Sequence, residues 1–182
     1  NNVRERLSTR QEVELFKMVS EPYPQHALPN ITYPQSMVLH FNGQEITLEH
    51  YANGHTDGDS VAFFQPANIV HMGDHMFQPM FPFIDLGTGG NALSFSRNVG
   101  QILSKIDDNT VVIPGHGGLT DKQGLEAYQH MLTGTIAEVR ALKESGHSLQ
   151  EAQAKGLSSQ WQHWNGGFIK QETWISFIYK SL

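Results

Sequence analysis

Three short segments of the sequence combine histidine or aspartate with glycine, at residues 54–60, 72–75 and 113–117. Each borders a short apolar run that is typical of a β-strand, so its polar side chains stand where a strand meets a loop. Glycine beside a metal ligand lets the backbone turn tightly and leaves space for the ion and a substrate. The pattern predicts a catalytic metal site built from histidine and aspartate on short turns.

Asp74 is the candidate whose chemistry is most specific. One carboxylate can bridge two metal ions about 3.5–4 Å apart, and the water held between them becomes hydroxide at neutral pH. We therefore interpret Asp74 as a catalytic residue that bridges two ions and positions water. A single aspartate or histidine at a strand end is more often a turn residue, so the prediction depends on the three segments occurring together.

In this order, the segments resemble the metallo-β-lactamase superfamily. The residues that carry the resemblance are His55-Thr56-x-Gly58-Asp59-Ser60, then Gly73-Asp74, then Pro114-Gly115-His116-Gly117. Residues 81–85 and 89–90 also resemble one hydrolase branch of the superfamily. The Gly-Asp pair, in a chain without cysteine, is similar to the glyoxalase-II-like and general metallohydrolase branch rather than to lactamases that use a cysteine ligand.

The resemblance implies an α/β fold, a four-layer αββα sandwich with a binuclear zinc site at one edge. It implies that His55 ligates the first zinc ion, that Asp74 bridges the two ions and that His116 ligates the second. Asp59 is interpreted either as a residue that orients a ligand or braces its loop, or as a turn residue before a strand. His75 is interpreted as a residue that lines the pocket.

The signature of the superfamily, His-x-His-x-Asp-His, is missing from the sequence. The candidate ligands His55, Asp74 and His116 give each of two zinc ions two protein ligands, whereas a catalytic zinc normally has three. We therefore expect weak or absent zinc binding and no efficient catalysis by the chain alone. The missing motif also predicts that residues 1–182 form a single truncated domain, the C-terminal portion of the sandwich, incomplete at its N-terminus.

Two functions from different classes follow. In the first, the chain is the C-terminal part of a zinc-dependent hydrolase that attacks an ester, thioester, lactone or amide of a small-molecule substrate with metal-activated water. In the second, it is a naturally truncated, non-catalytic remnant that self-associates. A sheet without its partner layer leaves an apolar face uncovered, and such chains pair with another copy or exchange elements. We therefore expect a homo-oligomer.

The elements that position these residues are predicted from local patterns. Asn42-Gly43 between two apolar runs predicts a β-hairpin over residues 36–51. Further strands are expected at residues 61–64, 69–72 and 110–113. Ser8-Thr9-Arg10-Gln11 has the pattern of a capping box and predicts a first helix over residues 9–19. The other expected helices cover residues 91–106, 121–144, 148–155 and 171–182.

Composition excludes several classes of protein. The 182 residues carry a net charge of −6, and no basic stripe is present that would contact nucleic-acid phosphates. The absence of cysteine excludes disulfide scaffolds and thiol nucleophiles. No apolar run approaches the roughly 18 residues of a membrane span, so no membrane partner is expected. The sequence does not specify a compartment, because any targeting segment would lie upstream of Asn1.

Overall fold

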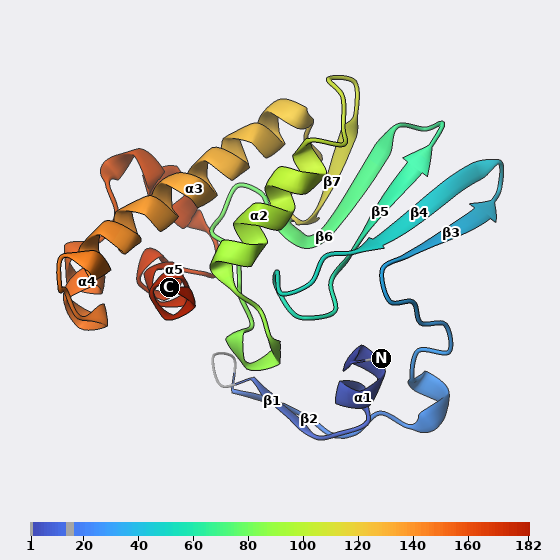
Figure 1. Ribbon diagram of the computed structural model, residues 1–182, viewed down its shortest axis with the longest axis horizontal. Coiled ribbons are helices and arrows are strands. Elements are labelled where there is room, and N and C mark those ends of the chain that lie inside the picture. Colours follow the sequence, from blue (N-terminus) through green and yellow to red (C-terminus); the bar gives the residue numbers. More distant parts are fainter. Residues whose placement is uncertain (1, 14–16) are drawn as a thin grey trace.

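A mixed five-stranded β-sheet forms the centre of the protein. The computed structural model describes residues 2–13 and 17–182. The strands lie in the order β3-β4-β5-β6-β7, where β7 is parallel to β6 and the other neighbours are antiparallel (Figure 1). Their bounds are β3 Ser36–Phe41, β4 Gln44–His50, β5 Ser60–Gln65, β6 Ile69–Phe77 and β7 Val111–His116. The predicted mixed α/β class is confirmed.

The hairpin between β3 and β4 forms at the predicted turn. Asn42 and Gly43 both have positive φ angles, 49° and 74°. Positive φ at both central residues is the requirement of a two-residue turn that matches the twist of antiparallel strands. The register pairs Phe41 with Gln44 and Leu39 with Ile46. The turn therefore sets which side chains of both strands share a face.

Four helices gather on one side of the sheet. α2 (Ala92–Leu103) and α3 (Lys122–Glu144) pack against β6 and β7, and α4 (Leu149–Lys155) and α5 (Gln171–Ser181) pack on α3 farther from the sheet (Figure 1). These four helices confirm the predicted ones to within a few residues, and Ser148 forms the predicted capping box with Glu151. None of the helices among the described residues is both long and apolar enough to cross a membrane.

The hydrophobic core lies between the helices and the helix-facing side of the sheet. Fully buried side chains from the sheet include Val61, Met72 and Val112, and Phe95 on α2 and Trp174 on α5 lie in the same cluster. Trp174 donates a hydrogen bond from its indole nitrogen to the Thr135 hydroxyl on α3 at 3.0 Å. The core therefore fixes α2, α3 and α5 against β6 and β7, the strands that carry two of the candidate ligands.

The prediction of a helix over residues 9–19 is wrong for the part that the structure describes. The helix α1 occupies Asn2–Leu7 instead, and β1 (Gln11–Val13) pairs antiparallel with β2 (Met18–Ser20). Ser8 does not cap a following helix, because its hydroxyl donates to the Arg4 carbonyl at the end of α1. The Gln11 side chain likewise donates back to the Arg6 carbonyl.

The apolar periodicity of this segment does not mark a buried face. Met18 and Val19 are 63% and 53% exposed, so they lie on no shared interface that would stabilise a short helix. Residues 14–16, which include the predicted helix positions Leu15 and Phe16, lie outside the described residues.

Strand β6 is longer than predicted, because a bulge lets it continue beyond Met72. The register with β7 shifts between His71 and Gly73 and again between Gly73 and Phe77. Gly73 has a φ of 52°, a conformation that glycine adopts without a steric penalty. A bulge bends a strand and changes the direction of the side chains that follow it. Asp74 is the first of these side chains.

Candidate metal centre

Three predicted ligands meet at one edge of the sheet. The Asp74 carboxylate lies between two imidazoles, with Oδ2 3.4 Å from His55 Nε2 and Oδ1 3.4 Å from His116 Nε2. Each carboxylate oxygen therefore faces one histidine. The three side chains come from the loop after β4, from β6 and from the last residue of β7. Their function as metal ligands stays a prediction.

His55 is oriented by backbone groups of a second loop. Its Nδ1 lies 2.9 Å from the Phe83 carbonyl oxygen, and the His55 carbonyl accepts a hydrogen bond from the Asp85 amide at 2.9 Å. Because a carbonyl can only accept, Nδ1 must carry the proton in this contact. In the neutral ring, Nε2 is then the unprotonated nitrogen, and it is the nitrogen that faces Asp74. The contact with Phe83 therefore leaves Nε2 of a neutral His55 ring available as a metal ligand.

The loop that carries His55 is braced by Asp59. The Asp59 carboxylate accepts hydrogen bonds from the Thr56 amide at 3.0 Å and from the Thr56 hydroxyl at 2.6 Å. Burial raises the pKa of Asp59, against the hydrogen bonds from Thr56 and the charge of His55, which lower it. The geometry shows contacts that hold the turn directly after His55, as the bracing interpretation requires.

Gly115 has no side chain and therefore leaves room for the Asp74 carboxylate. A Cβ atom on Gly115 would lie 2.5 Å from Asp74 Oδ1 and 2.5 Å from the Gly73 carbonyl oxygen. Real Cβ contacts are essentially never this short, so no side chain fits between β7 and the bulge of β6. The glycine of the Pro114-Gly115-His116 segment is therefore required by the approach of the two strands.

Aromatic rings surround His116. Phe77 stacks on its imidazole with ring centroids 4.6 Å apart and an interplanar angle of 11°, and Phe168 lies 5.7 Å from the same ring. The structure places Phe168 beside the site with 49% of its surface exposed. Phe168 reaches the site because the segment after the 3-10 helix Ser159–Gly166 passes beside β7. No local sequence signal predicts this contact between distant segments.

His75 does not line the pocket, so that prediction is wrong. Its side chain is fully buried, because consecutive residues of a strand point to opposite faces and Asp74 faces the candidate site. Its ring stacks on Phe95, and Nε2 lies 3.2 Å from the Asn98 amide nitrogen. Burial, with smaller contributions from the nearby histidines, lowers the pKa of His75 to about 3. His75 is a neutral core residue.

The donor set contains the right atom types for zinc but too few groups to enclose an ion. Two imidazole nitrogens and a carboxylate with one oxygen toward each are the donor types that zinc prefers. Within residues 2–13 and 17–182, however, no group of three or more His, Cys, Asp or Glu side chains is placed to hold an ion. The described residues therefore do not form a complete zinc site by themselves. The weak zinc binding expected from two ligands per ion stays a prediction.

Comparison with solved structures shows the same architecture. The chain aligns with the sec-alkylsulfatase from Pseudomonas sp. with a TM-score of 0.66 and 16% identity, over 95% of this chain and 30% of that one. It aligns with the metallo-β-lactamase from Pontibacter korlensis with a TM-score of 0.50 and 19% identity, over 59% and 50%. The chain has the metallo-β-lactamase fold.

Sequence relatives cover only part of the chain. An uncharacterized protein of Mycobacterium tuberculosis is 36% identical over 88 residues, which are 45% of this chain and 38% of the relative. An uncharacterized protein of Mycobacterium leprae is 41% identical over 69 residues, which are 37% of this chain and 31% of the relative. The chain thus matches less than two-fifths of the length of these relatives. No family model matches the chain.

Proposed function

We propose that this metallo-β-lactamase-fold chain supplies part of the zinc centre of a hydrolase, with the remaining ligands outside its 182 residues. The proposal is based mainly on the position of the Asp74 carboxylate. One of its oxygens lies 3.4 Å from His55 Nε2 and the other lies 3.4 Å from His116 Nε2. A bridging carboxylate between two histidines is the arrangement that a two-metal hydrolase needs. The fold shared with a sulfatase and with lactamases supports a hydrolase origin.

The residues of this chain would hold the ions in place. When bound, such a pair of zinc ions supplies an activated hydroxide for attack on an ester, thioester, lactone or amide. His55 presents Nε2 because its Nδ1 proton is committed to the Phe83 carbonyl. Stacking on Phe77 restricts the His116 ring, and the Thr56 contacts of Asp59 hold the His55 loop. These contacts pre-orient the ligands before a metal arrives.

Two ligands for each ion are too few for tight binding, so the proposal places the other ligands on a segment that carries His-x-His-x-Asp-His. The chain alone is then expected to bind zinc weakly and to hydrolyse esters no faster than the uncatalysed reaction. The general acid or base that the missing motif would carry is also absent from the sequence.

The test is to express the gene product together with the sequence encoded upstream of Asn1. We expect two zinc ions per chain by elemental analysis and hydrolysis within a panel of ester, thioester, lactone and amide substrates. Replacing Asp74 by Asn should abolish both. A folded longer product that binds no zinc would overturn the proposal.

The second candidate is a non-catalytic, self-associating remnant of the fold. It is favoured by the incomplete ligand set together with an apolar sheet face that no described layer covers. The same longer product discriminates between the two candidates. A product whose upstream sequence lacks His-x-His-x-Asp-His and which has no metal-dependent activity supports the remnant.

A further inference from the structure

The Phe168 ring lies beside the candidate metal centre without belonging to its donor set. Its centroid is 5.7 Å from the imidazole centroid of His116 and 6.0 Å from the ring centroid of Phe77. Phe77 is buried, whereas Phe168 is about half exposed. Phe168 therefore presents apolar surface to solvent directly next to a candidate ligand.

Tightly packed neighbours anchor the backbone of Phe168. Ile169, the next residue, is buried in the core. On the other side, a Cβ atom on Gly167 would lie 2.5 Å from the Met80 Cβ, so the chain packs directly on Met80. The exposed ring is thus carried by a segment that is held on both sides, which keeps it beside His116.

A substrate of the proposed centre has to reach Asp74 and His116, whose side chains are both accessible to solvent. A substrate group that extends from these residues across the His116 imidazole meets the Phe168 ring, because the two ring centroids are 5.7 Å apart. The ring offers apolar contact area and no oxygen or nitrogen for a hydrogen bond. Its position therefore makes it a wall of the space that a substrate would occupy.

A phenyl ring at this position selects an apolar partner. Covering apolar surface is favourable, and each methylene group removed from water strengthens binding about fourfold. A strongly polar group would lose its hydration against the ring and gain no hydrogen bond in return. A cationic group is attracted by an aromatic face, but here it would be repelled by the zinc ions that the centre is proposed to hold.

We propose that Phe168 determines substrate specificity by contacting an apolar chain of the substrate, a role that rests on the hydrolase function proposed above. The substrate class is then an ester, thioester, lactone or amide that carries an apolar chain close to the hydrolysed bond. Phe168 touches no reacting atom, so its contribution grows with the length of the chain that it covers.

The test uses the longer product that includes the sequence encoded upstream of Asn1, loaded with zinc. Within the class of the panel that this product hydrolyses, kcat/KM is measured for compounds that differ only in an apolar chain of two or six carbons, attached on either side of the hydrolysed bond. The unmodified product should favour the six-carbon chain at least about tenfold in one of these series. In Phe168→Ala this preference should fall at least about fivefold. The kcat/KM for the two-carbon compound should stay within about threefold, because the short chain leaves most of the ring uncovered.

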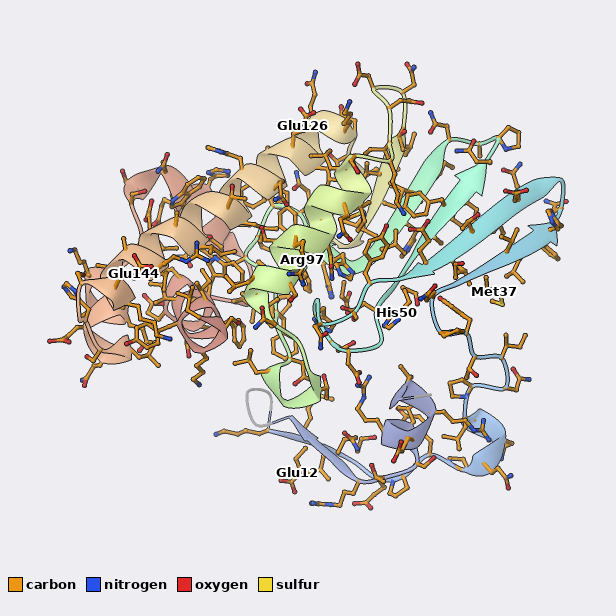
Figure 2. The ribbon with its side chains drawn as sticks, viewed as in Figure 1. Glu12, Met37, His50, Arg97, Glu126 and Glu144 are labelled. Atoms are coloured by element: carbon orange, nitrogen blue, oxygen red, sulfur yellow. The ribbon has the colours of Figure 1, made fainter. Side chains whose placement is uncertain are left out.

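Two further variants separate contact with the substrate from a general effect on the protein. Phe168→Leu keeps an apolar side chain and should retain most of the preference. The control is Val38→Ala, which should leave the preference unchanged. Val38 is 49% exposed, as Phe168 is, but it follows Met37 of Figure 2 on β3, at the opposite edge of the sheet from β7.

Circular dichroism and elemental analysis show whether each variant keeps its fold and its zinc. Phe168→Gln, polar and similar in size, repeats the test if the alanine variant does not fold. An equal loss for both chain lengths, or a loss of zinc, would overturn the specificity role, since the ring would then support His116 or the fold. Hydrolysis by the unmodified product without a preference for the longer chain would overturn this role alone and leave the proposed function standing. A product without zinc or hydrolysis would overturn both.

Discussion

The His55 imidazole donates its Nδ1 proton to the backbone carbonyl of Phe83, 2.9 Å away. This contact joins the loop after β4 to the loop after β6 and leaves Nε2 directed at Asp74, 3.4 Å away. A ligand whose direction is fixed by the fold loses less freedom when it binds an ion. The candidate centre is thus organised by a backbone group as well as by its own side chains.

Replacing Asp74 by Asn should weaken cobalt or zinc binding at least tenfold, because an amide cannot supply one anionic oxygen to each of two ions. The fold should be unaffected, since the side chain is 41% exposed. Isothermal titration calorimetry gives the affinity. The matched control is Asp108→Asn, whose side chain is 89% exposed and pairs with Lys122 rather than with a candidate ligand. Equal metal affinity in both variants would contradict the account.

Gly115→Ala should lower the free energy of unfolding by about 1–3 kcal/mol, because the added methyl group collides with Asp74 Oδ1 and the Gly73 carbonyl. The control is Gly118→Ala in the same loop, where nothing lies within 4 Å of the new Cβ. Its effect should stay within about 0.5 kcal/mol. Urea denaturation measures both. Similar values for the two variants would show that β7 does not approach Asp74 as closely as described.

Asp59→Ala should reduce metal affinity by about 10–100-fold while the ligands themselves remain, because the Thr56 contacts that hold the His55 loop are lost. Asp57→Ala is the control, since Asp57 lies in the same loop and pairs with Arg6. If titrations with cobalt give the same affinity for both variants, Asp59 is only a turn residue.

The pH dependence of stability follows from His75. Its pKa falls to about 3 in the folded protein, chiefly through burial, from an ordinary value of 6.5. Above pH 6.5 both states leave the ring neutral, and its full contribution to stability is present. Between pH 6.5 and 3 the unfolded chain binds a proton that the folded chain does not. The free energy of unfolding should therefore fall by up to about 1.4 kcal/mol for each unit of decreasing pH.

His75→Gln removes this titration, so its free energy of unfolding should depend less steeply on pH than that of the unmodified chain between pH 6.5 and 4. His163→Gln, which changes an exposed histidine, should leave the slope unchanged. Urea denaturation across this pH range checks the difference. Parallel curves for all three proteins would show that His75 binds a proton as readily in the folded chain as in the unfolded chain, which contradicts the account.

Local sequence signals correctly predicted those elements whose stabilising contacts lie between neighbouring residues. Asn42-Gly43 and the Ser148–Glu151 capping box act through neighbouring residues, so the hairpin and α4 form where they are predicted. The helix predicted near the N-terminus was wrong because the Ser8 and Gln11 side chains donate hydrogen bonds to backbone carbonyl groups of α1. They therefore do not cap a new helix.

The sequence predicted which residues meet at the candidate site but not the groups that hold them in place. His55, Asp74 and His116 stand out by type and by their glycine neighbours, and the structure brings them together. The bulge at Gly73 was not predicted, because it depends on the register with β7, so the direction of His75 was missed. The Phe83 carbonyl is a backbone group and leaves no signal in the sequence.

The most direct test of the candidate metal centre is a zinc titration of the whole chain labelled with nitrogen-15, followed through its histidine ring nitrogens. Single variants at positions 55 and 116 assign the signals. The account predicts that the Nε2 signals of His55 and His116 shift together, with a dissociation constant above about 1 µM, because each ion has two ligands from this chain. Stoichiometric binding at nanomolar zinc, or shifts confined to other histidines, would contradict it.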